Sequence, residues 1–258
     1  MGKTIAIFNQ KGGVGKTTTN INLAACLAMR GLDVLIMDID PQGNTTSGMG
    51  VSKRGRNNTM YEVLIEEDFD PGKAVLDTCV AGLSLIPASV RLAGGEVELV
   101  EMVEREKRLK KALAKIKDKF DYILIDCPPS LGLLTVNALT AVDSVLIPIQ
   151  CEFYALEGIS QLTATVDRVR KNYNPELDIQ GVVLSMFDGR TNLSIQVVEE
   201  AKNYFKEKIY KTIIPRNVRL AEAPSYGLPI TEYDPYSKGA QAYMDLADEF
   251  LKLEGKNK

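Results

Sequence analysis

The sequence contains no histidine, which excludes catalysis by a histidine base and any metal site built on imidazole ligands. Its four cysteines lack the C-x-x-C spacing of zinc or redox sites, which favours buried thiols in a reducing compartment over disulfides. No apolar run reaches the ~18 residues that a membrane-spanning helix needs. Because the N-terminal residues have the pattern of a strand and not of a signal peptide, we expect a cytoplasmic protein.

Excess positive charge is also missing. The formal net charge is −3, so any binding of nucleic acid has to come from a local basic patch or from an assembled dimer. The chain has 258 residues, of which 45% are hydrophobic and 25% charged, and this composition is typical of a globular α/β protein. We therefore expect residues 1–258 to form one domain.

One glycine-rich stretch, residues 10–18 (QKGGVGKTT), stands out. It follows an apolar run at residues 4–8 and precedes a helical pattern, which is the strand-loop-helix context of a phosphate-binding loop. The backbone N–H groups of such a loop bind phosphate at the positive end of the following helix. The residues predicted to contact nucleotide are Lys11, Gly12, Gly13, Val14, Gly15, Lys16, Thr17 and Thr18.

Within this loop, Lys16 is predicted to reach the β- and γ-phosphates and the Thr17 hydroxyl to ligate Mg²⁺. An ordinary glycine turn before a helix is the alternative, and the combination of glycines, Lys-Thr and flanking elements disfavours it. The usual G-x-x-x-x-G-K-[ST] pattern has glycine where this chain has Gln10. Lys11 follows, and a second lysine there would add positive charge beside the phosphates.

Alternating strand and helix patterns predict an α/β fold with a mostly parallel, twisted sheet covered by helices on both faces. The predicted strands are 4–8, 33–38, 83–87, 121–126, 143–149, 179–186 and 209–214. The predicted helices are 16–29, 60–66, 96–119, a segment from about residue 131, 155–173, 193–206 and 240–253, with an irregular connection at 88–95. The lysines of 96–119 are read as a solvated face, with a nucleic-acid face as the less favoured interpretation.

Acidic residues follow two of the buried strands. Asp38 and Asp40 come at the end of 33–38, and Asp126 ends 121–126, so all three should face the same crevice as the glycine loop. Asp126 is predicted to hold Mg²⁺, usually through water. The polar stretch from Asp38 to Asn44 is also compatible with a capped turn. A further loop at 215–220 follows the last strand, where a nucleotide base can rest.

The stretch from Lys11 to Thr17 resembles the deviant Walker A motif of the ParA/MinD family of dimerising ATPases, and the similarity extends over essentially the whole chain. Segments 127–135, 150–158 and 214–225 are most similar to the chromosomal ParA, or Soj, branch. The resemblance implies a three-layer αβα P-loop NTPase fold, ATP and Mg²⁺ as cofactors, and slow hydrolysis of ATP to ADP and phosphate.

The resemblance also implies individual roles. Lys11 would reach the nucleotide of a partner copy across an ATP-dependent homodimer, and Asp40 would position the attacking water, which makes Lys11, Lys16 and Asp40 the catalytic candidates. Thr17, Asp40 and Asp126 are the metal candidates. Backbone near Pro215 and the side chain of Asn217 would hold adenine.

Arg190 and Arg219 match arginines that bind DNA without sequence preference in such proteins, although exposed loop arginines are usually just solvated. Lys202, Lys206 and Lys208 could extend that patch. The implied function is chromosome or plasmid partitioning on the nucleoid, with a ParB/Spo0J-type centromere-binding partner.

Three alternatives remain at this point. A MinD-like membrane-cycling ATPase is one, but the acidic residues Asp245, Asp248 and Glu249 of the last helix argue against attachment to an anionic membrane. An iron–sulfur electron-transfer ATPase would need two suitably placed cysteines per chain, and Cys127 directly after Asp126 does not match. A metabolic P-loop ligase would not need Lys11.

Overall fold

The computed structural model describes residues 2–152 and 155–255. It describes the side chains of these residues except those of 155–159. Its eight strands form one sheet in the order β3-β4-β2-β5-β1-β6-β7-β8, and every pair is parallel except β3 with β4. The strands are β1 Lys3–Ile7, β2 Val34–Asp38, β3 Leu76–Asp77, β4 Leu83–Ile86, β5 Tyr122–Asp126, β6 Ser144–Gln150, β7 Asp178–Phe187 and β8 Ile209–Pro215. This confirms the mostly parallel sheet. The short β3 was not predicted.

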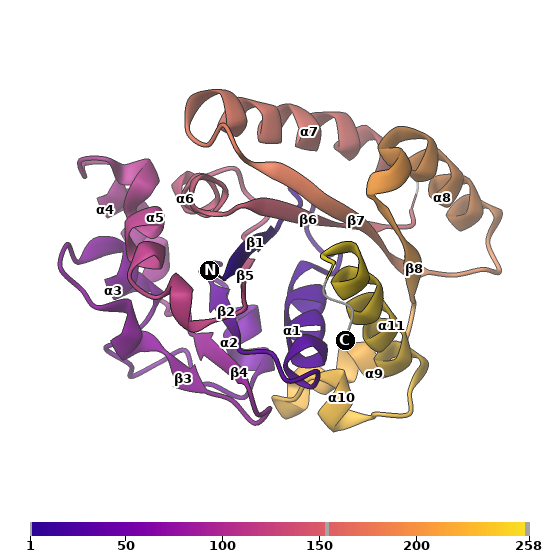
Figure 1. Cartoon of the computed structure of the whole chain (residues 1–258), viewed down its shortest axis with the longest axis horizontal. Helices are drawn as coiled ribbons and strands as arrows, with labels where there is room; N and C mark the ends of the chain where they lie inside the picture. Colours follow the sequence, from indigo (N-terminus) through magenta and orange to yellow (C-terminus); the bar gives the residue numbers. More distant parts are fainter. Residues whose placement is uncertain (1, 153–154, 256–258) are drawn as a thin grey trace.

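Helices cover both faces of the sheet (Figure 1). The helices are α1 Lys16–Ala28, α2 Asn44–Gly48, α3 Met60–Ile65, α4 Leu92–Leu99, α5 Arg108–Ala114, α6 Leu133–Ala141, α7 Ala155–Asn172, α8 Asn192–Phe205, α9 Val218–Glu222, α10 Ile230–Tyr233 and α11 Lys238–Leu253. One core lies between the sheet and α3, α5, α6, α7 and α8, and a second core lies between the sheet and α1 and α11. The predicted three-layer αβα arrangement is confirmed.

The long helix predicted over 96–119 is wrong. The chain there forms α4, a loop, the 3-10 turn Arg105–Lys107, α5 and the 3-10 turn Lys117–Lys119. Glu104 adopts a left-handed conformation with φ 50°, which ends any continuous helix before α5 begins. The predicted irregular connection over 88–95 is also too long, because α4 begins at Leu92.

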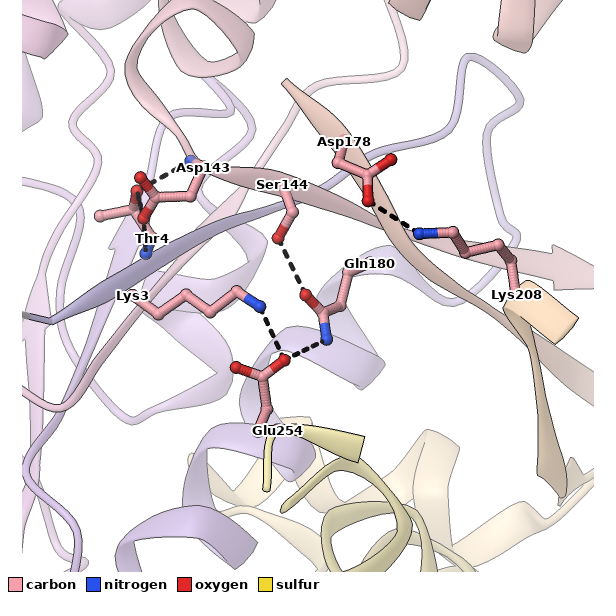
Figure 2. A network of polar contacts seen from close by, with 8 residues as sticks. All are labelled: Lys3, Thr4, Asp143, Ser144, Asp178, Gln180, Lys208 and Glu254. Carbon is pink, nitrogen blue, oxygen red and sulfur yellow. Dashed lines mark hydrogen bonds and ion pairs between the residues drawn. The ribbon is translucent and has the colours of Figure 1, made fainter. Parts of the chain in front are cut away.

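Polar contacts fix the amino ends of the central strands (Figure 2). Asp143, which precedes β6, accepts hydrogen bonds from the backbone N–H and the hydroxyl of Thr4 in β1, at 2.7 and 2.8 Å. Ser144 donates to Gln180 of β7 at 3.1 Å, and Gln180 donates to Glu254 at 2.7 Å. Lys3 pairs with the same Glu254 at 2.6 Å. The end of α11 is thereby bound to two strands of the sheet.

Other acids near the end of α11 have internal partners as well. Glu249 accepts hydrogen bonds from the backbone N–H groups of Lys211 and Thr212 in β8, at 2.7 and 2.8 Å. Asp248 pairs with Arg30 beyond α1 at 2.6 Å. Much of the acidity of this helix therefore attaches it to the sheet and to α1. Within the described residues, no helix is both long and apolar enough to cross a membrane.

Candidate functional site

The glycine-rich loop lies between β1 and α1, at the carboxyl edge of the sheet and on its central strand. Gly13 and Gly15 have φ values of 74° and 90°, a region that favours glycine. A Cβ atom added to Gly12 or Gly13 would meet nothing within 4 Å, so the space above the loop is open to a ligand. The Ser185 hydroxyl donates to the carbonyl of Val14 at 2.8 Å and joins the loop to β7.

Both lysines of the loop contribute to its shape. The buried Lys16 side chain folds back, and its Nζ donates to the carbonyl of Lys11 at 3.0 Å. The Lys11 backbone N–H donates to Asn9 Oδ1 at 3.0 Å. Burial lowers the pKa of Lys16, while the nearby Asp126 partly offsets this effect. Lys16 therefore lies in the charge environment of the acids that follow β2 and β5.

Asp126 is the centre of a hydrogen-bonded cluster at the end of β5. Its Oδ2 accepts hydrogen bonds from the hydroxyls of Thr17 in α1 and Thr45 in α2, both at 2.8 Å. Its Oδ1 is buried and has no hydrogen-bond partner among the described residues. Burial raises the pKa of Asp126, and the two hydroxyls partly offset the rise. A buried carboxylate oxygen with an open coordination position, beside a threonine hydroxyl, fits a hard cation such as Mg²⁺.

Asp38 holds the segment that contains Asp40. Its Oδ2 accepts the backbone N–H and the hydroxyl of Thr46 at 2.7 Å each, and its Oδ1 accepts the backbone N–H of Asp40 at 3.3 Å. Burial and then the charge of Asp126 raise the pKa of Asp38. Asp40 itself is buried, and its Oδ1 accepts the N–H of Gln42 at 2.9 Å. The capped turn considered from the sequence is therefore present, and the charge of Asp40 acts on Lys16 of the glycine loop.

On the other side of the loop lies a pocket of about 360 Å³. The predicted adenine residues Pro215 and Asn217 line it, together with Gly15 and Thr18 of the loop. The Asn217 side chain also caps α9 by accepting the N–H of Arg219 at 2.8 Å. Three other lining residues were not predicted from the sequence: Ser185, Met186 and Tyr243.

Only weak signals pointed to two of these lining residues, Ser185 and Met186. Met186 has φ 53°, a conformation that is unusual for a side-chain-bearing residue and often found at functional sites. Ser185 and Met186 lie at the end of β7, which pairs with β6, and β6 in turn pairs with β1, the strand before the glycine loop. This position in the sheet could have drawn attention to them. Tyr243 comes from α11, and its hydroxyl lies 3.2 Å from that of Thr19. No local sequence pattern connects it to the pocket.

The two predicted DNA-contacting arginines lie beyond the carboxyl ends of the neighbouring strands β7 and β8. Both are exposed, and both have acidic partners within the chain. Arg190 pairs with Asp188 at 2.6 Å, and Arg219 pairs with Glu222 at 2.9 Å and with Asp234 at 3.3 Å. Lys202, Lys206 and Lys208 are all exposed, and Lys208 pairs with Asp178 at 2.7 Å.

The four cysteines are free thiols. Cys26, Cys127 and Cys151 are buried, and Cys79 is exposed. Of the segment 150–158, residues 153–158 fall outside the residues whose side chains the structure describes.

Comparison with known proteins identifies the family to which this chain belongs. A profile described as an AAA domain matches residues 2–179. Over 249 residues the chain is 61% identical to the sporulation initiation inhibitor protein Soj of Bacillus subtilis (strain 168), with 96% of this chain and 98% of that protein covered. This chain belongs to the ParA/Soj family of P-loop ATPases.

Other ParA-type relatives agree. The chromosome partitioning protein ParA of Myxococcus xanthus is 53% identical over 255 residues, covering 98% of this chain and 89% of that protein. Among solved structures, a cobyrinic acid a,c-diamide synthase from Mycobacterium smegmatis with bound ADP and magnesium has a TM-score of 0.86 and 36% identity, and covers 100% of this chain and 97% of its own. The P-loop NTPase fold is thereby confirmed.

Proposed function

We propose that this ParA/Soj-family chain is an ATP-dependent dimerising switch that binds DNA without sequence preference and partitions chromosomes or plasmids. One observation carries the nucleotide part of the proposal: the P-loop threonine donates to a buried aspartate whose second oxygen has no described partner. This is the arrangement that a nucleotide-bound Mg²⁺ would complete. The solved relative with ADP and magnesium supports the same ligands.

In this proposal the loop from Gly12 to Thr18 holds the phosphates through its N–H groups. Lys16 leaves the Lys11 carbonyl to contact the β- and γ-phosphates, and Thr17 and Asp126 hold the metal, with Asp40 close by. Mg²⁺ would supply charge stabilisation of the transferring phosphoryl group. Asp40, positioned by Asp38, orients the attacking water. Pro215 and Asn217 hold the adenine in the pocket beside the loop.

The dimer part of the proposal depends on Lys11. Two ATP-bound copies would associate so that Lys11 of each contacts the phosphates of the other. The Lys16 ammonium, which donates to the Lys11 carbonyl in this structure, would exchange that contact for the phosphates when ATP binds. Hydrolysis removes the γ-phosphate that both lysines hold and thereby dissolves the dimer.

DNA binding would follow from dimerisation. One copy presents only a weak basic patch around Arg190 and Arg219, both of which are paired with acids. A dimer presents two patches to one DNA, which raises affinity by avidity and steepens its salt dependence. The arginines would exchange their acidic partners for phosphates on binding. Through this contact the chain would occupy the nucleoid in the cytoplasm, and a ParB/Spo0J-type partner would stimulate hydrolysis.

We further propose that residues 1–258 act as one domain, which the single sheet supports. The deciding experiment measures binding to a random-sequence DNA duplex with ADP, ATP and a nonhydrolysable ATP analogue, together with the molar mass from light scattering. We expect dimers and DNA retention with ATP and the analogue, and monomers that release DNA with ADP. Equal DNA affinity in the three nucleotide states would refute the proposal.

A MinD-like membrane cycle is the competing function, and pelleting with anionic liposomes tests it. We expect no ATP-dependent pelleting, because Asp248, Glu249 and Glu254 already attach the end of α11 to the rest of the chain.

A further inference from the structure

Thr45, the second residue of α2, is fully buried and contacts the aspartate that ends β5. Its hydroxyl donates to Asp126 Oδ2 at 2.8 Å, and the same oxygen accepts from the hydroxyl of Thr17 at 2.8 Å. One carboxylate oxygen is thus held from two helices, α1 and α2, which β2 separates along the chain. The glycine-loop motif accounts for Thr17 but not for Thr45.

Asn20, three residues after Thr17 in α1, sets the direction of the Thr45 hydroxyl. Its Nδ2 donates to Thr45 Oγ1 at 3.3 Å, and its side chain is fully buried. A hydroxyl has one proton to donate and accepts through its lone pairs, whereas an ionised carboxylate only accepts. Because the Asn20 amide occupies the acceptor side of the hydroxyl, the proton of Thr45 points at Asp126.

The two hydroxyls together fix the rotation of the Asp126 carboxyl group. Both threonines donate to Oδ2, while Oδ1 is buried and has no hydrogen-bond partner within the described part of the chain. With only one donor the carboxyl group could turn, because the energy wells for this torsion in aspartate are broad. The second donor, from another helix, removes this freedom and leaves Oδ1 for a cation. Groups that orient a metal ligand in this way raise metal affinity by about 10–100-fold.

The helix that carries Thr45 is itself anchored. The next residue, Thr46, donates to Asp38 Oδ2 from its backbone N–H and its hydroxyl, at 2.7 Å each. The Thr46 hydroxyl also accepts the backbone N–H of Ala88, which follows β4, at 2.8 Å. α2 is thereby fixed to the ends of two strands, and the Thr45 hydroxyl is a support of fixed position.

We propose that Thr45, oriented by Asn20, is a positioning residue for the nucleotide-bound Mg²⁺, because it holds Asp126 with Oδ1 directed at the cation. The inference rests on the metal-holding role that the proposed function gives to Thr17 and Asp126. Thr45 does not touch the metal and acts through Asp126. A hydroxyl that only stabilised the fold would contribute equally with and without Mg²⁺, and this difference separates the two roles.

The test compares Thr45→Val with the parent chain. Valine has nearly the shape of threonine and a similar helix propensity, but it lacks the hydroxyl. Binding of a fluorescent nonhydrolysable ATP analogue is measured over a series of Mg²⁺ concentrations and in EDTA, and the thermal midpoint without nucleotide checks the fold. Thr45→Ser restores the hydroxyl. Thr140→Val is the matched control, because it removes a buried hydroxyl of α6 that has no hydrogen-bond partner among the described residues.

We expect Thr45→Val to need about tenfold more Mg²⁺ for half-maximal binding of the analogue. Its affinity in EDTA should match that of the parent, and Thr45→Ser should recover most of the Mg²⁺ affinity. Asn20→Ala should shift the Mg²⁺ requirement in the same direction, because the hydroxyl loses its orienting donor. Thr140→Val should behave as the parent. If Thr45→Val does not fold, Thr45→Ala carries the same test.

Equal Mg²⁺ dependence in Thr45→Val and the parent would overturn the proposal. An equal loss of affinity with and without Mg²⁺ would overturn it too, because the hydroxyl would then serve the fold alone. Failure of the proposed function would appear separately. If the parent bound the analogue equally well in EDTA and in Mg²⁺, the metal site itself would be refuted, whereas a parent that needs Mg²⁺ beside an unchanged Thr45→Val variant would refute only the role of Thr45.

Discussion

Asp143 offers a quantitative test of how β1 is held in the sheet. The Thr4 N–H that it accepts belongs to a fully buried residue. Asp143→Ala removes two charge-assisted hydrogen bonds, each worth ~1.5–3 kcal/mol, and leaves that N–H without its acceptor. The pair with Lys117 at 3.0 Å is partly exposed and adds only ~0–1 kcal/mol. We expect the free energy of unfolding to fall by about 3 kcal/mol.

Asp143→Asn provides the matched control. The amide oxygen can still accept from Thr4, so this variant should lose only about 1 kcal/mol, mostly from the Lys117 contact and the weaker acceptor. Urea unfolding followed by circular dichroism measures both variants. ATP affinity should stay at the parental value, because Asp143 lies at the end of β6 opposite the glycine loop.

The effect should also depend on pH. Burial alone would raise the pKa of Asp143, but hydrogen bonds from Thr4 and Lys117 outweigh it and the pKa is lowered. A carboxylate with a lowered pKa in the folded state contributes stability above its unfolded pKa, and this contribution is lost as the pH falls through the folded value. The gap between parent and Asp143→Asn should therefore be constant from about pH 8 to 5 and shrink below about pH 4. A gap that widens in acid, or an alanine variant within about 0.5 kcal/mol of the parent, would refute this account.

Three further predictions concern the site. Lys16→Ala should abolish ATP binding in calorimetry, because the loop loses its phosphate-contacting ammonium, and retained affinity would contradict the assignment of the loop. Asp40→Ala should still bind ATP but hydrolyse it at least about a hundredfold more slowly. Light scattering should then show a persistent ATP-bound dimer, and a monomer would argue against the proposed role of Asp40. Arg219→Ala should keep that dimer and lose DNA retention, whereas Arg219→Lys should keep part of it. If Arg219→Ala and the parent retained DNA equally over a salt series, the DNA contact would not include Arg219.

The sheet and the glycine loop could be predicted because their signals are local. Buried strands such as 121–126 are short apolar runs, and the loop and its flanking elements lie within about 25 consecutive residues. The prediction of one helix over 96–119 was wrong. The composition of this segment favours helix throughout, whereas the left-handed Glu104 separates α4 from α5. The backbone conformation of a single glutamate cannot be predicted from the composition of the segment.

Much of the site depends on contacts between distant residues. Tyr243 reaches the pocket beside Gly15 only because α11 packs on α1, and the contact of Asp126 with Thr45 needs β5 and α2 to meet. The ion pair of Arg219 with Asp234, which lies beyond α10, likewise joins residues that are not neighbours in the sequence. Sequence spacing predicted which residues share an edge of the sheet, and only the structure showed what each of them contacts there.

The central position of β1 has a practical consequence. With β5 on one side and β6 on the other, the loop after β1 separates the carboxylates of β2 and β5 from the cleft formed by β7, β8 and α11. Enlarging that cleft, for instance by Met186→Ala, should admit an ATP derivative with a bulky group on its base while leaving the carboxylates in place. A cell that carries such an enlarged-cleft allele could then have this one ATPase inhibited by a compound that its other nucleotide-binding proteins cannot accept.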